Sequence, residues 1–268
     1  MNRITNAKRI VCKVGTSTLT YENGKLNLRR LEELCKVLSD LQNSGREIVL
    51  VSSGAIAVGM GKLGMTRRPE EKEKRQALAA VGQCELMFMY DKLFEEYNNT
   101  VAQVLLTADN VYSEQSHENI ENTFRELIGM GIIPVVNEND TVGTDELSGQ
   151  HIGDNDTLSA IVATLAQADL LVIFTDIDAL YDDNPKTNPN ARRIPRVTEI
   201  TDEIRALAGG AGTNRGTGGM ATKVHAAEIT MRENIPCCVI GGDTPAKLYD
   251  LLDGADMGTL FAAPGADE

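Results

Sequence analysis

Short apolar runs alternate along the chain with longer segments in which apolar positions recur at a helical period. The runs are continuously apolar, as strands are when both faces of their sheet are covered. They predict strands at residues 9–14, 47–51, 101–106, 132–136, 170–174 and 236–240. Helices are expected between them, near residues 28–43, 70–97, 116–130, 155–168, 222–234 and 244–252.

Strand–helix alternation predicts an α/β fold with a mainly parallel sheet and right-handed crossovers. Two polar segments interrupt the pattern. Residues 181–196 hold three of the eight prolines and predict a long loop or small hairpin, and residues 209–219 contain six glycines. Neither is a domain linker, so we expect one domain over residues 1–268. In such sheets ligands bind beyond the carboxyl ends of the strands.

Composition narrows the class of protein. Aromatic residues make up only 4% of the chain and Trp is absent, so the core must be aliphatic. The five cysteines form no CxxC pair, which favours reduced thiols in a cytoplasmic protein. No apolar run approaches the roughly 20 residues of a membrane-spanning helix. The net charge of −13 argues against a nucleic-acid partner, because phosphate backbones require clustered Lys and Arg.

Candidate phosphate-binding residues follow the first predicted strand. Lys13 ends an otherwise apolar run, and Gly15, Thr16 and Ser17 come directly after it. A glycine lets a ligand approach the backbone, and the N–H and hydroxyl groups can donate to phosphate oxygens. The alternative is a lysine that faces solvent at the end of a strand.

Small polar residues follow the second predicted strand. Ser52, Ser53 and Gly54 open a helix whose free N–H groups can bind a carboxylate or another anion, although an ordinary N-cap is the alternative. Residues 59–64, GMGKLG, match the dinucleotide pattern GxGxxG. Because they do not follow a strand directly, as that fingerprint requires, we do not expect a dinucleotide site there.

Two further polar clusters suit recognition of a charged substrate. Residues 137–140, NEND, end in Asp140 and could bind an ammonium group, with an Asx-rich turn as the alternative. Asp154, Asn155 and Asp156 open the helix predicted from residue 155. Capping accounts for one of these side chains but not for all three, so they could instead position lysines or Mg²⁺.

The last two clusters lie in the C-terminal third of the chain. Thr175 and Asp176 follow the fifth predicted strand. Residues 216–219, GTGG, precede a helix that carries Lys223 in its first turn. A glycine loop before a helix suits a polyphosphate, although this is not a Walker loop. A flexible turn with a surface lysine is the alternative.

Taken in order, KVGTS, SSGAIA, NEND, GDND, FTDIDALY and GTGGMATK resemble the amino-acid kinase family, and its glutamate 5-kinase branch in particular. The resemblance implies a three-layer αβα sandwich. An N-terminal lobe, about residues 1–168, would bind L-glutamate, and a C-terminal lobe, about residues 169–268, would bind ATP with Mg²⁺. The chain stops where many members continue into a small RNA-binding-type domain, so it resembles a short form.

The resemblance also implies roles for single residues. Lys13 and Lys223 would contact the transferring phosphate, and Asp156 would orient both lysines. The residues that would bind glutamate are Ser53, Asp140 and Asn155. The residues that would border ATP are Lys13, Gly15, Thr175, Asp176, Thr217, Gly218, Gly219, Met220, Ala221, Thr222 and Lys223. Mg²⁺ would be carried by ATP rather than by protein ligands.

The implied reaction moves the γ-phosphate of ATP to the γ-carboxylate of L-glutamate, the first step of proline biosynthesis. A carboxylate with a pKa of ~4.3 is already a nucleophile at neutral pH, so no general base is required. Proline is an implied feedback inhibitor, glutamyl phosphate reductase an implied pathway partner, and a homodimer or homotetramer the implied assembly. The alternatives are a kinase of the same fold that acts on acetylglutamate, carbamate, aspartate or a nucleoside monophosphate, and a non-catalytic amino-acid sensor.

Overall fold

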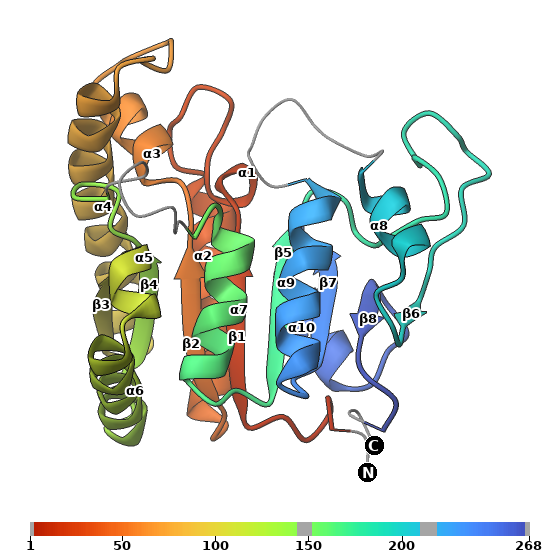
Figure 1. The fold of residues 1–268 in the computed structure, drawn as a ribbon. Coiled ribbons are helices and arrows are strands. Elements are labelled where there is room, and N and C mark those ends of the chain that lie inside the picture. Colours follow the sequence, from red (N-terminus) through yellow and green to blue (C-terminus); the bar gives the residue numbers. More distant parts are fainter. Residues whose placement is uncertain (1–2, 144–151, 210–218, 266–268) are drawn as a thin grey trace.

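The described strands form one sheet in the order β3-β4-β2-β1-β5-β7-β8-β6 (Figure 1). The computed structural model describes residues 3–143, 152–209 and 219–265. Neighbouring strands are parallel except for β7 and β8. The strands are β1 (Arg9–Val14), β2 (Glu47–Ser52), β3 (Val101–Leu106), β4 (Ile133–Glu138), β5 (Leu170–Thr175), β6 (Arg196–Val197), β7 (Cys237–Gly241) and β8 (Thr259–Phe261).

Helices connect these strands and lie on both faces of the sheet (Figure 1). They are α1 (Thr16–Leu19), α2 (Leu28–Asn43), α3 (Ala55–Lys62), α4 (Lys72–Glu95), α5 (Ala108–Tyr112), α6 (Glu114–Gly129), α7 (Asn155–Leu165), α8 (Asp202–Gly209), α9 (Met220–Arg232) and α10 (Lys247–Leu252). None of the helices in the described ranges is both long and apolar enough to cross a membrane.

The sheet lies between two layers of helices. An aliphatic core fills the space between the sheet and the helices on each face. Along β1, Ile10, Cys12 and Val14 pack into the core under α2, α4 and α10, whereas Val11 packs into the core under α6, α7 and α9. This alternation is the period-2 geometry of a strand covered on both faces. The α/β class and the three-layer sandwich with a mainly parallel sheet are therefore confirmed.

The six predicted strands are confirmed within two residues at each end, with one informative difference. The sequence predicts that β4 stops at residue 136, because four polar residues follow. The strand instead continues through Asn137 and Glu138, which pair with Leu105 and Leu106 of β3. Asn137 is only 3% exposed, and it can be buried because other side chains satisfy its carboxamide.

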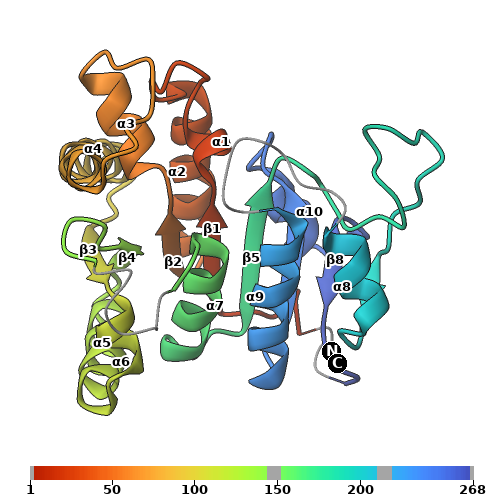
Figure 2. The ribbon, with the colours of Figure 1, turned by 45° about the horizontal axis from the view of Figure 1, so that its top comes forward.

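The segment between β5 and β6 projects from the body of the molecule in Figure 2. Tyr181 and Arg193 form an isolated antiparallel bridge across it, which agrees with the prediction of a long loop or small hairpin. The carboxyl ends of β1, β2, β4 and β5 lie on one edge of the sheet, because these strands are parallel and adjacent in the order above. The polar clusters found in the sequence therefore meet at that edge.

Candidate active site

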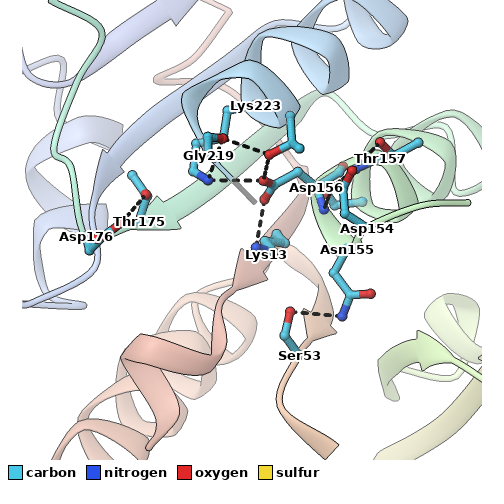
Figure 3. A network of polar contacts seen from close by, with 12 residues as sticks. Lys13, Ser53, Asp154, Asn155, Asp156, Thr157, Thr175, Asp176, Gly219 and Lys223 are labelled. Atoms are coloured by element: carbon cyan, nitrogen blue, oxygen red, sulfur yellow. Dashed lines mark hydrogen bonds and ion pairs between the residues drawn. The ribbon is translucent and has the colours of Figure 1, made fainter. Parts of the chain in front are cut away.

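Two lysines converge on one buried carboxylate at the carboxyl edge of the sheet (Figure 3). Lys13 Nζ lies 2.7 Å from Asp156 Oδ1, and Lys223 Nζ lies 3.1 Å from Asp156 Oδ2. The Thr222 hydroxyl donates to Asp156 Oδ2 at 2.6 Å. Asp156 is 1% exposed, and the lysines are 7% and 4% exposed. The structure thus brings together three residues that are far apart in the sequence.

Each of these side chains reaches the cluster through its own element. Lys13 is the fifth residue of β1, and the strand alternation turns it to the face covered by α7 and α9. Asp156 lies in the first turn of α7, where the helix dipole favours a negative charge. Lys223 lies in the first turn of α9, where the dipole disfavours a positive charge. Helix stability does not explain this lysine, whereas the ion pair with Asp156 does.

The cluster is ionised and carries a net positive charge. Burial alone would raise the pKa of Asp156, but the charges of Lys13 and Lys223 outweigh that effect and lower the pKa to about 2. Counted over the described residues alone, the ammonium groups of Lys13 and Lys223 and the carboxylate of Asp156 sum to one positive charge, and all three side chains are buried. A positive charge held in place at a strand end is suited to an anionic ligand such as phosphate.

The backbone beside Lys13 is open for such a ligand. A β-carbon added to Gly15 would lie 3.7 Å from Lys13 Nζ and 3.9 Å from Ser17 Oγ. Any larger residue at this position would therefore occupy the space between the ammonium and the hydroxyl. The two distances are ordinary contact distances and the φ of Gly15 is −87°, so packing within the protein does not by itself require a glycine here.

Asn155 and Ser53 form a second polar group beside the lysine cluster, and Asn155 is the neighbour of Asp156 at the start of α7 (Figure 3). The Asn155 carboxamide donates to Ser53 Oγ at 2.9 Å and to the Ser52 carbonyl at 3.1 Å. Asp154 caps α7 by accepting hydrogen bonds from the backbone N–H groups of Asp156 and Thr157. One of the three polar residues is therefore the cap, while Asn155 and Asp156 point into the candidate site.

The other predicted site residues in the described ranges lie after β4, at the end of β5 and at the start of α9. Asp140 is half-buried in the turn directly after β4. Thr175 ends β5 and is buried, while Asp176 is exposed and lies 3.9 Å from Lys186 Nζ. At the start of α9, Gly219 is the N-cap residue, Met220 is buried and Ala221 is exposed. Thr217 and Gly218 lie outside the described residues.

A narrow pocket adjoins the nucleotide side of the predicted site. Its lining is mostly apolar or aromatic, with Ile177, Tyr181, Leu207 and Met220 among its members, and it also includes the acidic residue Asp183. It begins just after Asp176, and it reaches the first residue of the helix that carries Lys223. Sequence reasoning missed this pocket because its walls come from three separate segments with no motif of their own.

Sequence reasoning also missed Gln83 and the burial of Asn137. Asn137 Nδ2 donates to Gln83 Oε1 at 2.9 Å, and Asn155 Nδ2 donates to Asn137 Oδ1 at 2.9 Å. The available signal was a glutamine among the apolar positions of a long helix, VGQCELMF. A buried amide needs hydrogen-bond partners and so indicates a polar neighbour.

The GxGxxG match has a packing explanation. Gly59 lies inside α3, where an added β-carbon would be 2.1 Å from the Leu78 carbonyl oxygen. An added β-carbon at Gly61 would be 2.4 Å from the Gly24 carbonyl oxygen. These glycines let protein backbones touch each other, so their spacing gives no support for a dinucleotide site.

The described His, Cys, Asp and Glu side chains do not form a metal-binding cluster. Across residues 3–143, 152–209 and 219–265, no three of them are grouped so as to hold a metal ion. Both oxygens of Asp156 already face ammonium groups. A metal ion carried by the phosphate oxygens of a nucleotide stays a prediction.

Comparisons with known proteins agree with this geometry. The model of the amino acid kinase family matches residues 8–241. A glutamate 5-kinase of Clostridium perfringens is 54% identical over 96% of both chains, and one of Enterococcus faecalis is 48% identical over 98% of both. A glutamate 5-kinase of Listeria monocytogenes serovar 1/2a is 52% identical over 96% of this chain and 94% of its own.

A solved structure with a similar fold is a UMP kinase from Bacillus anthracis. The TM-score is 0.63 over 96% of both chains, at 17% sequence identity, so this likeness supports the fold alone. The family model spans most of the chain, and the curated relatives cover nearly all of it. The chain therefore belongs to the amino acid kinase family.

Proposed function

We propose that the protein transfers the γ-phosphate of ATP to the γ-carboxylate of L-glutamate. The observation that carries this proposal is the buried Lys13–Asp156–Lys223 cluster beside the Ser53–Asn155 pair. The names of the relatives, which are about 50% identical over nearly the whole chain, supply the substrate. An acceptor site and a phosphate site on consecutive residues of α7 provide the proximity that the reaction needs.

The chemistry requires charge stabilisation rather than proton removal. A γ-carboxylate oxygen attacks the γ-phosphorus, the bond between that phosphorus and the β,γ-bridging oxygen breaks, and ADP leaves with the electron pair. Lys13 and Lys223 offset the charge on the transferring group. Asp156, whose pKa is about 2, holds both ammonium groups in place and remains ionised throughout.

The nucleotide is proposed to lie on the C-terminal side of the cluster. Thr175 and Asp176 would border it, and the residues from Thr217 to Lys223 would contact its phosphates. Mg²⁺ would be carried by the phosphate oxygens, where it would neutralise part of their charge. Glutamate is proposed to lie on the N-terminal side, against Ser53, Asp140 and Asn155.

Proline is proposed to inhibit by competing with glutamate. It carries the same α-carboxylate and a cationic nitrogen, so a site that recognises these groups accepts it, but it lacks the γ-carboxylate and does not react. Inhibition that high glutamate relieves would support this proposal, and inhibition that glutamate leaves unchanged would refute it. The product, an acyl phosphate, requires a consuming reaction, which we propose is that of a glutamyl phosphate reductase.

The proposed activity is tested by trapping the acyl phosphate. The protein is incubated with Mg-ATP, hydroxylamine and one carboxylate at a time: L-glutamate, N-acetylglutamate or L-aspartate. Hydroxylamine converts an acyl phosphate into a hydroxamate, which is measured by its colour with iron. Hydroxamate with glutamate and little with the other two supports the proposal. Hydroxamate only with N-acetylglutamate contradicts the substrate, and none with any carboxylate contradicts the reaction.

A further inference from the structure

Gln83 is a buried polar residue with no part in the function proposed above. It lies on α4, well before the NEND and GDND motifs in the chain, and is 9% exposed. Its neighbours on the same helix face, Ala79 and Leu86, belong to the apolar core. A glutamine in such a place loses its hydration, so its contacts must compensate for the loss.

The contacts of Gln83 form a directed chain of carboxamides. Gln83 Oε1 accepts from Asn137 Nδ2 at 2.9 Å, so the Asn137 nitrogen faces α4 and its oxygen faces the other way. Asn137 Oδ1 in turn accepts from Asn155 Nδ2 at 2.9 Å. A backbone carbonyl can only accept, so the Ser52 oxygen fixes the direction of the Asn155 carboxamide. The same direction continues through Asn137, and the oxygen of Gln83 accepts the last hydrogen bond of the chain.

The last member of this chain faces the candidate acceptor site. Asn155 Nδ2 is shared among protein oxygens of Asn137, Ser53 and Ser52. Within the described residues, no hydrogen bond reaches Asn155 Oδ1. The oxygen is thus the atom left to accept a hydrogen bond from a cationic ligand group. If the carboxamide were turned over, its nitrogen would face such a group and repel it.

Close backbone packing holds Gln83 in place. A β-carbon added to Gly82 would lie 1.7 Å from the Ala55 carbonyl oxygen, so α4 touches the start of α3 directly. Figure 1 and Figure 2 both show the two helices side by side. Two turns further along α4, the Tyr90 hydroxyl lies 2.8 Å from Ser52 Oγ. The helix is therefore fixed to the ends of two strands that carry acceptor-site residues.

We infer that Gln83 is a positioning residue for the acceptor amino acid. Through Asn137 it supports the position of the Asn155 side chain, whose oxygen is proposed to face the α-ammonium group of the substrate. This inference rests on the proposed function, and it adds a residue outside the motifs that define the site. Gln83 is linked to Asn155 by way of Asn137, so we expect its effect on the substrate to pass through Asn155.

The test is a double-mutant cycle between Gln83→Met and Asn155→Ala. Methionine keeps the length of glutamine but removes the acceptor oxygen. Alone, Gln83→Met should raise KM for glutamate about tenfold, the effect of about one hydrogen bond to a charged group, while KM for ATP and kcat stay within about twofold. In the Asn155→Ala background the same change should alter KM for glutamate less than about twofold, because the group it positions is gone. Leu86→Met, one turn further along α4, is the matched control and should leave all three constants near normal.

Additive effects would overturn the inference, because a residue that only fills space acts equally in both backgrounds. A parallel rise in both KM values would overturn it as well. The cycle is repeated by urea unfolding without substrate, where the midpoint shift caused by Gln83→Met should be smaller in the Asn155→Ala background. If the wild type formed no hydroxamate with glutamate, the proposed function would fail, and the unfolding cycle would still decide whether the two residues are linked.

Discussion

At the scale of single residues, the position of Lys223 is explained by the site rather than by the stability of its helix. This lysine is a cation in the first turn of a helix, 4% exposed, in a place that the helix dipole makes unfavourable. A buried charge of this kind persists only with a good partner, and Asp156 is that partner. The same carboxylate holds Lys13, so one residue fixes both cations before a substrate arrives.

Each lysine should stabilise the transition state more than the bound substrates. Lys13→Ala and Lys223→Ala should therefore lower kcat on the order of 10²-fold or more, as the loss of one preorganised donor does in other enzymes. Initial rates of hydroxamate formation at saturating substrates measure this. Lys62→Ala, which removes an exposed lysine paired with Glu85, is the control and should keep kcat within about twofold. A lysine variant with near-normal kcat would remove that residue from the mechanism.

Asp156 also makes a testable contribution to stability. Its pKa falls from 3.8 to about 2 on folding, so the folded state binds fewer protons than the unfolded state in this range. The stabilisation is complete above about pH 5 and is mostly lost as the pH falls to about 2; its size is about 2 kcal/mol.

Urea unfolding of the wild type and Asp156→Asn between pH 7 and pH 2 measures this contribution. The variant should be less stable at neutral pH, because two buried ammonium groups lose their counter-charge. The difference between the two proteins should shrink by about 2 kcal/mol between pH 5 and pH 2. A difference that stays constant would mean that Asp156 is not the ionised group of the cluster.

At the scale of elements, the contact between α3 and α4 is set by missing side chains. Gly59 and Gly82 allow the two helix backbones to touch, and this places α4 beside the loop that contains Ser53. The glycines are visible in the sequence, but their role is not, because the hydrophobic pattern does not predict that α3 packs against α4. The dinucleotide-like spacing of GMGKLG has separate causes, because Gly59 packs against α4, Gly61 packs against Gly24, and Gly64 has a positive φ of +67°.

Gly82→Ala should therefore separate the two helices. The added methyl group would meet the Ala55 carbonyl oxygen at 1.7 Å, so the backbones must shift, at a cost of about 1–3 kcal/mol or more. Gly129→Ala, at the last residue of α6 with no heavy atom within 4 Å, is the control. The control should be neutral or stabilising by up to about 1 kcal/mol. Chemical denaturation of both variants decides the matter, and equal stabilities would contradict the packing account.

The predictability of each element follows from its length and burial. The six longer strands, of five or six residues each, are recognisable because their sequences are mostly apolar, as strands inside a sheet are. β6 and β8, with two and three residues, are too short to show a period and were not predicted. The extension of β4 through Asn137 was not predictable either, because its burial depends on Gln83, which is 54 positions away in the chain.

At the scale of the whole molecule, α7 divides the site. Asn155 faces the residues that end β2 and β4, and Asp156 faces β1 and α9. The ordered motifs predicted that these residues would meet, because parallel neighbouring strands end on the same edge. The directions of the carboxamides and the pocket beside Tyr181 needed the folded structure, because both arise from contacts between distant segments.

This division predicts separate effects on the two substrates. Asn155→Ala and Asp140→Ala should raise KM for glutamate far more than KM for ATP, and Thr175→Val should do the reverse. Initial-rate kinetics with each substrate varied in turn give the ratio of the two effects. Equal changes in both KM values, or changes for ATP alone with Asn155→Ala, would place these residues on the wrong side of the site.

The most direct test of the whole account follows one oxygen atom. L-Glutamate labelled with ¹⁸O in its γ-carboxylate is incubated with Mg-ATP and the wild-type protein. If the carboxylate attacks the γ-phosphorus, one labelled oxygen becomes bonded to phosphorus. The acyl phosphate then cyclises as its own α-amine attacks the acyl carbon, and the released phosphate keeps that oxygen. Mass spectrometry should find one ¹⁸O in each phosphate formed in a glutamate-dependent way. Phosphate without the label, or phosphate formed equally fast without glutamate, would show that ATP is cleaved by water and would contradict the account.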